Sequence, residues 1–414
     1  MPSWRDSVSR SISWAACIAY AGLFFSIPVS NITLFILLAC CLLTLNFSIV
    51  AESIKSSLPI QLLIAFYLLH TVGLLYSQNM DNGLFVLEKK MTLLVFPLLL
   101  FPAWQNLASD KRSTLPFRIG VITIGSSIVF LVLATINKFF YKDSLAFHRD
   151  YFASTPYVFY SIYFATGSLL LLNSCYNRWQ NSKTRILVLL LLPAYSLSML
   201  VLISSKTGIL AYVTGLGYFL YKRLPSRRLF YTSVAGLILS SALLLVAYPT
   251  TLNRFLELNK NLAVVNEDLL TNPEEFTGLN LRLYFWKSSI TQLWKDNRLI
   301  TGIGTGDGQD YLNMVYAKHR LDKYGYTDFD AHSQWIMTLL QLGLLGVGLL
   351  AAIFLIGARL ARRFRSIDFL FFAWIVFCFS LSESVLESNK GVVFFALLFS
   401  MFSAHDNKTP SHPG

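Results

Sequence analysis

The side chain best suited to proton transfer lies where a long polar segment gives way to an apolar run. His332 follows Asp330 and precedes the run Ile336–Leu340. A histidine can accept a proton near neutral pH, and a neighbouring carboxylate can orient its ring. Position alone leaves open a second interpretation, an interfacial histidine bonded to water or to a backbone carbonyl. His70 and His148 are the competing candidates.

Four basic side chains could bind an anion on the same side of the molecule as His332. Arg282 lies in a helix-like run and can hold phosphate oxygens through paired N–H groups. Lys206 begins an apolar run, and Lys90 and Arg149 lie beside others. Each has an alternative role at the membrane surface, where basic side chains snorkel or contact headgroups. Together with one histidine base, these cations form a candidate binding site for an anionic lipid headgroup. A diphosphate is its natural ligand, stabilised by the cations as it leaves.

Two acidic residues, Glu383 and Glu387, stand four positions apart, which predicts that they share one helical face. Two like charges there need a cation such as Lys390. We interpret them as support for the basic site, with a structural salt-bridge network as the equal alternative. No His/Cys cluster indicates a catalytic metal, so we expect no metal and no cofactor.

Composition places these residues in a membrane protein. Hydrophobic residues make up 55% of the 414-residue chain and charged residues only 14%, against about 25% charged in soluble domains. The apolar residues form blocks near the length that crosses a bilayer as a helix. We therefore predict an all-α, polytopic membrane protein. Its expected spans are 11–28, 31–46, 59–77, 91–104, 117–138, 156–175, 186–204, 207–222, 229–248, 333–358, 367–384 and 391–404.

The net charge of +12 invites a nucleic-acid interpretation. We favour another, in which Lys and Arg gather in the short loops that face the cytoplasm. With the N-terminus inside, basic clusters such as 222–228 and 359–365 fall on the cytoplasmic side. No basic stripe interleaved with aromatic residues stands out from these loops. The sequence therefore predicts no nucleic-acid partner and two cytoplasmic termini.

The same topology puts the long polar segment on the outer face. The chain then divides into spans one to nine (1–248), an outer loop (249–331), spans ten to twelve (332–404) and a cytoplasmic tail (405–414). Apolar and aromatic residues at helical spacing predict amphipathic helices at about 279–296 and 307–318, which would rest on the spans as a lid. Between them, the alternate glycines from Gly302 to Gly308 predict a tight turn. Backbone amides that contact a ligand are the alternative.

Several elements in this order resemble the O-antigen ligase family. They are the long outer loop before the last three spans, Asn280-Leu281-Arg282, the Gly-x-Gly-x-Gly turn, His332-Ser333-Gln334-Trp335 and the run 342–346. The element Ser205-Lys206-Thr207-Gly208 is also specific. The superfamily includes O-antigen polymerases and protein O-oligosaccharyltransferases.

The resemblance implies a bacterial inner-membrane enzyme whose active site faces the periplasm. Such an enzyme moves a glycan from undecaprenyl diphosphate to the lipid A–core oligosaccharide, with inversion at the anomeric carbon and without metal or ATP. His332 corresponds to the family's essential histidine and Arg282 to its lid arginine. Lys206 stands where the family usually has arginine, so the bidentate phosphate contact is in question. Lys90 corresponds less closely to a basic residue before span four, and Glu383 to an acid on span eleven.

The predicted site thus has three sets of residues. The predicted catalytic residues are His332, Arg282 and Lys206, and the predicted diphosphate-binding residues are Arg282, Lys206, Lys90 and Arg149. The predicted supporting residues are Glu383, Asp330 and Gln334. The expected partners are the donor lipid, the acceptor and the membrane lipids.

Two alternatives to a ligase stay open. A polymerase or protein glycosyltransferase of the same fold differs mainly in its acceptor, which the sequence does not reveal. A transporter of lipid-linked glycans would favour charges near the middle of the spans. Here they lie at the outer ends, with His70 as the main exception.

Overall fold

The computed structural model describes residues 4–44, 47–140, 156–179, 182–224, 226–247, 252 and 278–404. Every regular element in these residues is helical. The α-helices are α1 (Trp4–Gly22), α2 (Ile27–Leu42), α3 (Phe47–Lys55), α4 (Leu58–Leu74), α5 (Met80–Lys90), α6 (Thr92–Val95), α7 (Phe101–Gln105), α8 (Ser109–Ser113), α9 (Leu115–Phe140), α10 (Tyr157–Arg178), α11 (Ser182–Leu202), α12 (Lys206–Arg223), α13 (Arg227–Ala247), α15 (Gly278–Lys295), α16 (Gly308–Lys318), α17 (Gln334–Arg363), α18 (Ile367–Ser382) and α19 (Asn389–Ser403). A π-helical turn (Phe96–Leu100) joins α6 to α7, and 3-10 turns lie at Asp322–Tyr324 and Val385–Glu387.

Helical structure overlaps every stretch that was expected to span the membrane, which confirms the all-helical class. Four stretches of helix in the described chain are long and apolar enough to cross a bilayer: Ser109–Phe140, Tyr157–Arg178, Lys183–Leu202 and Gln334–Arg363. Shorter apolar helices, among them α2, α4, α18 and α19, fall below that length. The count of twelve spans stays a prediction.

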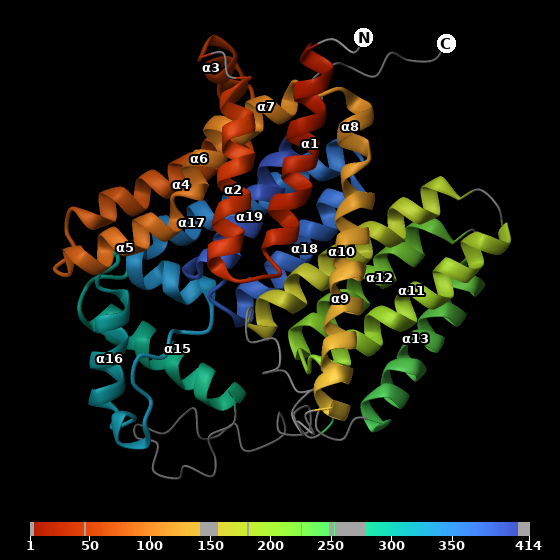
Figure 1. Cartoon of the computed structure of the whole chain (residues 1–414). Helices are drawn as coiled ribbons and strands as arrows, with labels where there is room; N and C mark the ends of the chain where they lie inside the picture. The colour runs from red at the N-terminus through yellow and green to blue at the C-terminus, as the bar shows by residue number, and fades with distance from the viewer. Residues whose placement is uncertain are drawn as a thin grey trace.

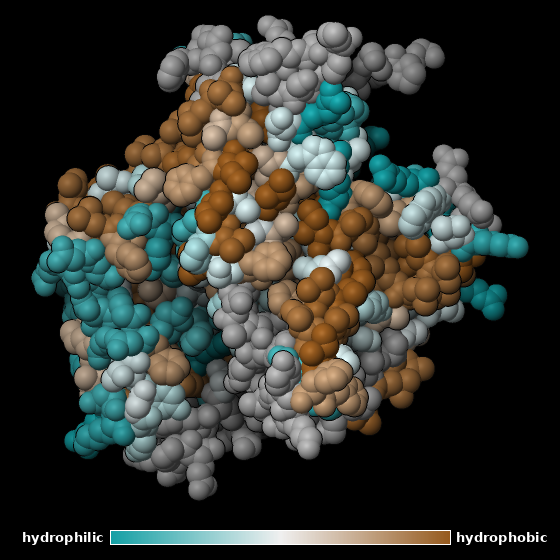
Figure 2. All heavy atoms as spheres, in the orientation of Figure 1, coloured by the Kyte–Doolittle hydropathy of each residue, from teal (hydrophilic) through white to brown (hydrophobic). Residues whose placement is uncertain are grey.

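The bundle is built around α10, most of whose side chains are buried. This helix packs against α9, α11, α12 and α18. The outward side of α9 is apolar as well, and Phe139 and Phe140 are 72% and 80% exposed. Figure 2 shows hydrophobic side chains over this face of the bundle and hydrophilic ones over α15 and α16. Apolar residues on both the inner and outer sides of helices are expected where lipid replaces water.

Short helices at one end of the bundle lie opposite α15 and α16 (Figure 1). Of these, α3 ends in Lys55 and α8 carries Lys111 and Arg112. The fold therefore separates these basic residues from the polar segment, as the predicted topology requires. The orientation in a membrane stays a prediction.

The described part of the outer segment, residues 278–331, is called the lid below. Its helices α15 and α16 confirm the two amphipathic helices expected there. They share one hydrophobic cluster with the first turns of α17, and the buried members include Tyr284, Phe285, Leu312, Tyr316, Met337 and Leu340. The lid is therefore packed onto the span that follows it and does not form a core of its own.

The helix α17 is broken at Gly343, where φ is +63° and ψ is −160°. The break directs backbone N–H and C=O groups of α17 toward the lid, whose backbone forms hydrogen bonds with them. Ile303 N donates to Leu340 O at 2.8 Å, and Leu344 N donates to Leu299 O at 2.9 Å. A Cβ at Gly343 would lie 2.1 Å from Ile300 O, so this close approach requires glycine.

Candidate active site

Three predicted residues meet where the lid reaches the starts and ends of the spans. Arg282 lies in α15, His332 lies in the turn before α17, and Glu383 directly follows α18. Arg282 Nη2 lies 2.9 Å from Glu383 Oε1, and His332 Nδ1 lies 3.4 Å from Glu383 Oε2. One carboxylate therefore contacts both the candidate base and the candidate phosphate ligand.

His332 is held from the lid side as well. Asp330 Oδ1 accepts a hydrogen bond from the backbone N of His332 at 2.9 Å and lies 3.3 Å from Nδ1. The adjacent Ala331 carbonyl accepts from Trp286 Nε1 of α15 at 2.7 Å. These contacts hold His332 at φ +47°, a left-handed conformation that few residues other than glycine adopt. Strained backbone of this kind often accompanies functional sites.

The contacts of His332 assign different roles to its two ring nitrogens. Nδ1 faces the carboxylates of Asp330 and Glu383, which favours the tautomer with its proton on Nδ1. Nε2 then carries the lone pair and can accept a proton. The His332 side chain is 32% exposed, so a substrate hydroxyl can reach it.

Arg282 is similarly accessible, with 27% of its side chain exposed. A guanidinium has five N–H donors in a plane. Its contact with Glu383 involves Nη2, which leaves other donors available to a ligand. The arrangement combines one base with an anion-binding cation on the same side of the fold.

Lys206 begins α12, as the sequence predicted. The helix is capped by Ser205, whose Oγ accepts from Gly208 N at 3.1 Å. Thr207 Oγ1 lies 2.8 Å from Ser382 Oγ, one residue before Glu383. The half-buried Lys206 is thus placed beside the end of α18 from which Glu383 extends.

The prediction that Glu383 and Glu387 share one helical face is wrong. The helix α18 ends at Ser382, and Glu383 has extended backbone with φ −149° and ψ 147°. A short 3-10 turn then carries Glu387. Ending the helix lets the two carboxylates point to different partners, so their repulsion is avoided. A continuous helix would have set them side by side.

Lys90 is the partner of Glu387. Its Nζ lies 2.5 Å from Glu387 Oε1, and its side chain is fully buried. Lys390, the partner considered from the sequence, donates instead to the carbonyls of Leu23 and Phe25. The structure thus places Lys90 beside the turn that follows Glu383 and carries Glu387, and not at the exposed side of Arg282.

The other predicted residues take varied positions. Gln334 is buried, and its side chain contacts Leu386 N, Thr338 and Glu387. His70 is buried in α4, with Phe66 as a ring neighbour. Arg149 and His148, the residues 253–277 of the outer loop and the tail 405–414 lie outside the described residues.

The glycine turn between α15 and α16 is confirmed as a tight turn. Gly302 and Gly304 have φ of +71° and +116°. The amides of Gly304 and Gly306 donate to Gln341 O and Ser77 Oγ, so they bind the protein itself. The turn therefore clamps the lid between α17 and the segment after α4, and these amides are engaged within the fold.

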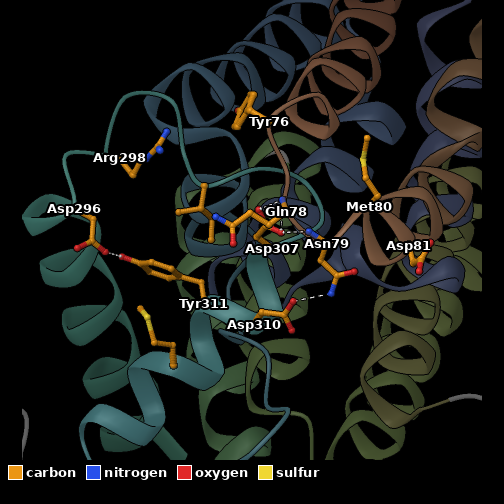
Figure 3. Close-up of a pocket in the computed structure, with 12 residues that line it drawn as sticks. Tyr76, Gln78, Asn79, Met80, Asp81, Asp296, Arg298, Asp307, Asp310 and Tyr311 are labelled. Carbon is orange, nitrogen blue, oxygen red and sulfur yellow. Dashed lines mark hydrogen bonds between the residues drawn. The ribbon is translucent and has the colours of Figure 1, made fainter.

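A hollow of about 770 Å³ lies beside this turn, between the end of α4 and the lid. Figure 3 shows Asp310 of the lid pointing toward Asn79, which follows α4, and Asp296 pointing toward Tyr311 within the lid. The hydrogen bond from Tyr311 lowers the pKa of Asp296. None of the predicted site residues lines this hollow, and its contacts dock the lid.

Asp307 joins the lid to the segment after α4, and its loss is expected to loosen the lid. Its carboxylate accepts from the backbone N of Gln78 at 2.9 Å and of Asn79 at 2.8 Å. Asp307→Ala should cost about 1 kcal/mol of local stability and accelerate hydrogen exchange at these amides. Asp81→Ala, on the same rim but outside these hydrogen bonds, is the control. Unchanged exchange in Asp307→Ala would contradict the docking role.

Sequence reasoning named Gln334 but missed Thr338 and Gln341, which continue a polar row inside α17. Gln334, Thr338 and Gln341 are buried, and their spacing places them on one helical side. Gln341 Nε2 donates to Glu387 Oε2 at 3.2 Å. Polar residues at helical spacing in an otherwise apolar run are a usable signal for an internal contact.

Comparison with known proteins relates part of this chain to a family. Curated proteins give no match. The family model described as O-Antigen ligase matches residues 188–351. The matched range contains Lys206, Arg282 and His332, together with the broken part of α17. Over residues 188–351, the chain is therefore similar to the O-antigen ligase family.

Proposed function

We propose that this protein is a membrane glycosyltransferase of the ligase type. It would move an O-antigen glycan from undecaprenyl diphosphate to the lipid A–core oligosaccharide at the periplasmic face of the bacterial inner membrane. The observation that carries the proposal is the convergence of His332, Arg282 and Glu383 at the rim of the lid. The family match over residues 188–351 supports it.

The reaction follows from the two roles in the site. His332 Nε2 takes the proton from the acceptor hydroxyl, and the hydroxyl oxygen attacks the anomeric carbon of the donor sugar. The bond from that carbon to the diphosphate oxygen breaks, and undecaprenyl diphosphate leaves with the electron pair. Attack from the side opposite the leaving group inverts the anomeric centre.

The cations stabilise the charge that develops on the leaving diphosphate. Arg282 can keep Glu383 on one edge and present its other N–H groups to phosphate oxygens. Lys206 adds a single positive charge from the start of α12. Fixed cations that face a developing charge lower the barrier because they need no reorganisation during reaction.

Glu383 links the two halves of this mechanism. Its carboxylate contacts His332 Nδ1 and Arg282 Nη2, so it sets the distance between base and phosphate ligand. When His332 becomes an imidazolium, Glu383 and Asp330 lie beside the new positive charge and stabilise it. Both acids therefore support the base without contacting the sugar.

The acceptor is tested in a strain that lacks this gene. A ligase mutant should carry bare core in electrophoresis of its lipopolysaccharide and should accumulate lipid-linked polymer. Core capped by one repeat would identify a polymerase, and intact lipopolysaccharide with loss of protein-linked glycan would identify a protein glycosyltransferase. Transfer by purified protein in detergent, without a sealed membrane, would exclude transport as the sole role.

Arg282→Gln is expected to weaken donor use because it removes the bidentate cation while retaining a planar, polar side chain. The rate of transfer should fall about 10²–10³-fold, the scale for loss of one charge-stabilising donor. The assay is transfer in detergent with the donor concentration varied. Lys295→Gln, at the other end of α15, is the control. Near-normal kinetics in Arg282→Gln would remove the arginine from the phosphate site.

A further inference from the structure

A buried ionic contact lies behind the proposed site and plays no part in the chemistry described above. Lys90 Nζ and Glu387 Oε1 are 2.5 Å apart, with side-chain exposures of 0% and 11%. The same carboxylate accepts from Gln334 Nε2 at 3.1 Å and from Gln341 Nε2 at 3.2 Å. Glu387 is therefore held by side chains from both α5 and α17.

Burial shows that Lys90 is not open to a lipid diphosphate. Arg282 and His332 are 27% and 32% exposed, whereas the Lys90 side chain is enclosed and its charge is matched by Glu387. Burial acts to raise the pKa of Glu387, but the Lys90 ammonium, with His70 and the hydrogen bonds from Lys90 and Gln334, overcomes this and lowers that pKa to about 2. A diphosphate would have to displace Glu387, a buried and well-bonded anion, before it reached Lys90.

The segment that this ion pair holds is the one that presents Glu383. Residues 383–388 leave α18 in extended and 3-10 conformations and have no α-helical ladder of their own. Gln334 binds both parts of the segment. Its backbone N donates to Glu383 O at 3.1 Å, and its side-chain oxygen accepts from Leu386 N at 2.6 Å.

We infer that Lys90 is a positioning residue, whose buried ion pair with Glu387 fixes the segment 383–388 so that the Glu383 carboxylate reaches both His332 and Arg282. This inference rests on the proposed function, because it concerns the geometry of that site. It replaces the direct contact between Lys90 and diphosphate that the sequence suggested. Removing the ion pair should therefore harm turnover and leave donor binding intact.

A double-mutant cycle tests the inference in the purified full-length protein. The variants are Lys90→Met, Glu387→Gln and the two combined, assayed for transfer in detergent. Each single change should lower kcat by about 10–100-fold, the scale for loss of a partner behind a functional side chain, with donor KM unchanged. The combined variant should recover about tenfold over Lys90→Met because no buried charge is left unpaired.

The control is the neighbouring Lys89→Met. Lys89 lies over the exposed ring of Phe85, 4.6 Å from its centroid, and carries no buried partner of this kind. Its variant should keep normal kcat and KM. If Lys90→Met does not fold, the combined variant decides the matter by its binding of undecaprenyl diphosphate alone.

The outcomes separate this inference from the proposed function. If Lys90 binds diphosphate directly, the combined variant will bind undecaprenyl diphosphate as poorly as Arg282→Gln and will stay as slow as Lys90→Met. That result would overturn the positioning role. If His332→Ala transfers normally in the same assay, the proposed function fails, whatever the Lys90 variants do.

Discussion

Replacement of His332 by asparagine is expected to reduce glycan transfer by about 10²–10⁴-fold, the usual contribution of a general base. Asparagine removes the base and tolerates the left-handed backbone better than most residues, so it isolates the chemical effect. His332→Ala should be at least as inactive, and its backbone should be strained by about 1–2 kcal/mol. Donor KM should change little in either variant, because Arg282 and Lys206 are retained.

The measurement is the rate of transfer by purified protein, with His319→Gln as the matched control. His319 lies in the lid, where its Nδ1 contacts the Tyr284 hydroxyl at 2.8 Å. Insertion and monodispersity should be normal in all three variants. Wild-type rates in His332→Asn would rule out a base at this position.

Gly343→Ala is the second change for which we expect a large effect, here on stability. Alanine would be strained at φ +63°, and its Cβ would overlap Ile300 O, 2.1 Å away. The backbone strain alone should cost about 1–3 kcal/mol, and relieving the overlap would separate the lid from α17. We expect a lower unfolding temperature in detergent and loss of transfer together.

Gly348 offers a matched control on the same helix. Apart from its chain neighbours and the backbone of its own helix, no described atom lies within 4 Å of a Cβ at Gly348, so Gly348→Ala should be neutral or slightly stabilising through helix propensity. Equal unfolding temperatures for the two variants would mean that the break at Gly343 tolerates a side chain. The contact with Ile300 would then not hold the lid.

Local pattern was enough to predict the lid helices and the start of α12. Aromatic residues such as Tyr284 and Phe285 recur at helical spacing in a polar segment, so their buried side was visible in the sequence. Lys206 is a lone charge beside an apolar run, which marked the beginning of a helix. In both cases the information lies within a few residues.

Such local patterns could not predict which residues pair with one another in the site. Arg282 and Glu383 are 101 positions apart in sequence, and Lys90 and Glu387 are 297 apart. Apolar spans carry little periodicity, so the sequence does not say which of their ends become neighbours. The prediction for Glu383 and Glu387 was wrong for a related reason. A spacing of four residues places two side chains on one face only within a helix, and α18 ends at Ser382.

The break in α17 was hidden because glycine is common in membrane helices. Gly343 lies in a run of leucine and glycine that reads as one uninterrupted span. Its special role depends on Ile300 and Leu299, which approach from the lid. No property of the run itself distinguishes Gly343 from Gly346 or Gly348.

The break in α17 also dictates an order of assembly. An interrupted helix in hydrocarbon exposes backbone groups at a cost of several kcal/mol each, and here Leu299, Ile303 and Gly304 satisfy those groups. These residues are synthesised before α17. In the predicted topology, with the lid on the outer face, their segment has to cross the membrane before it can pair with that helix. In that topology, translocation of the polar segment before α17 is a precondition for the final fold of α17.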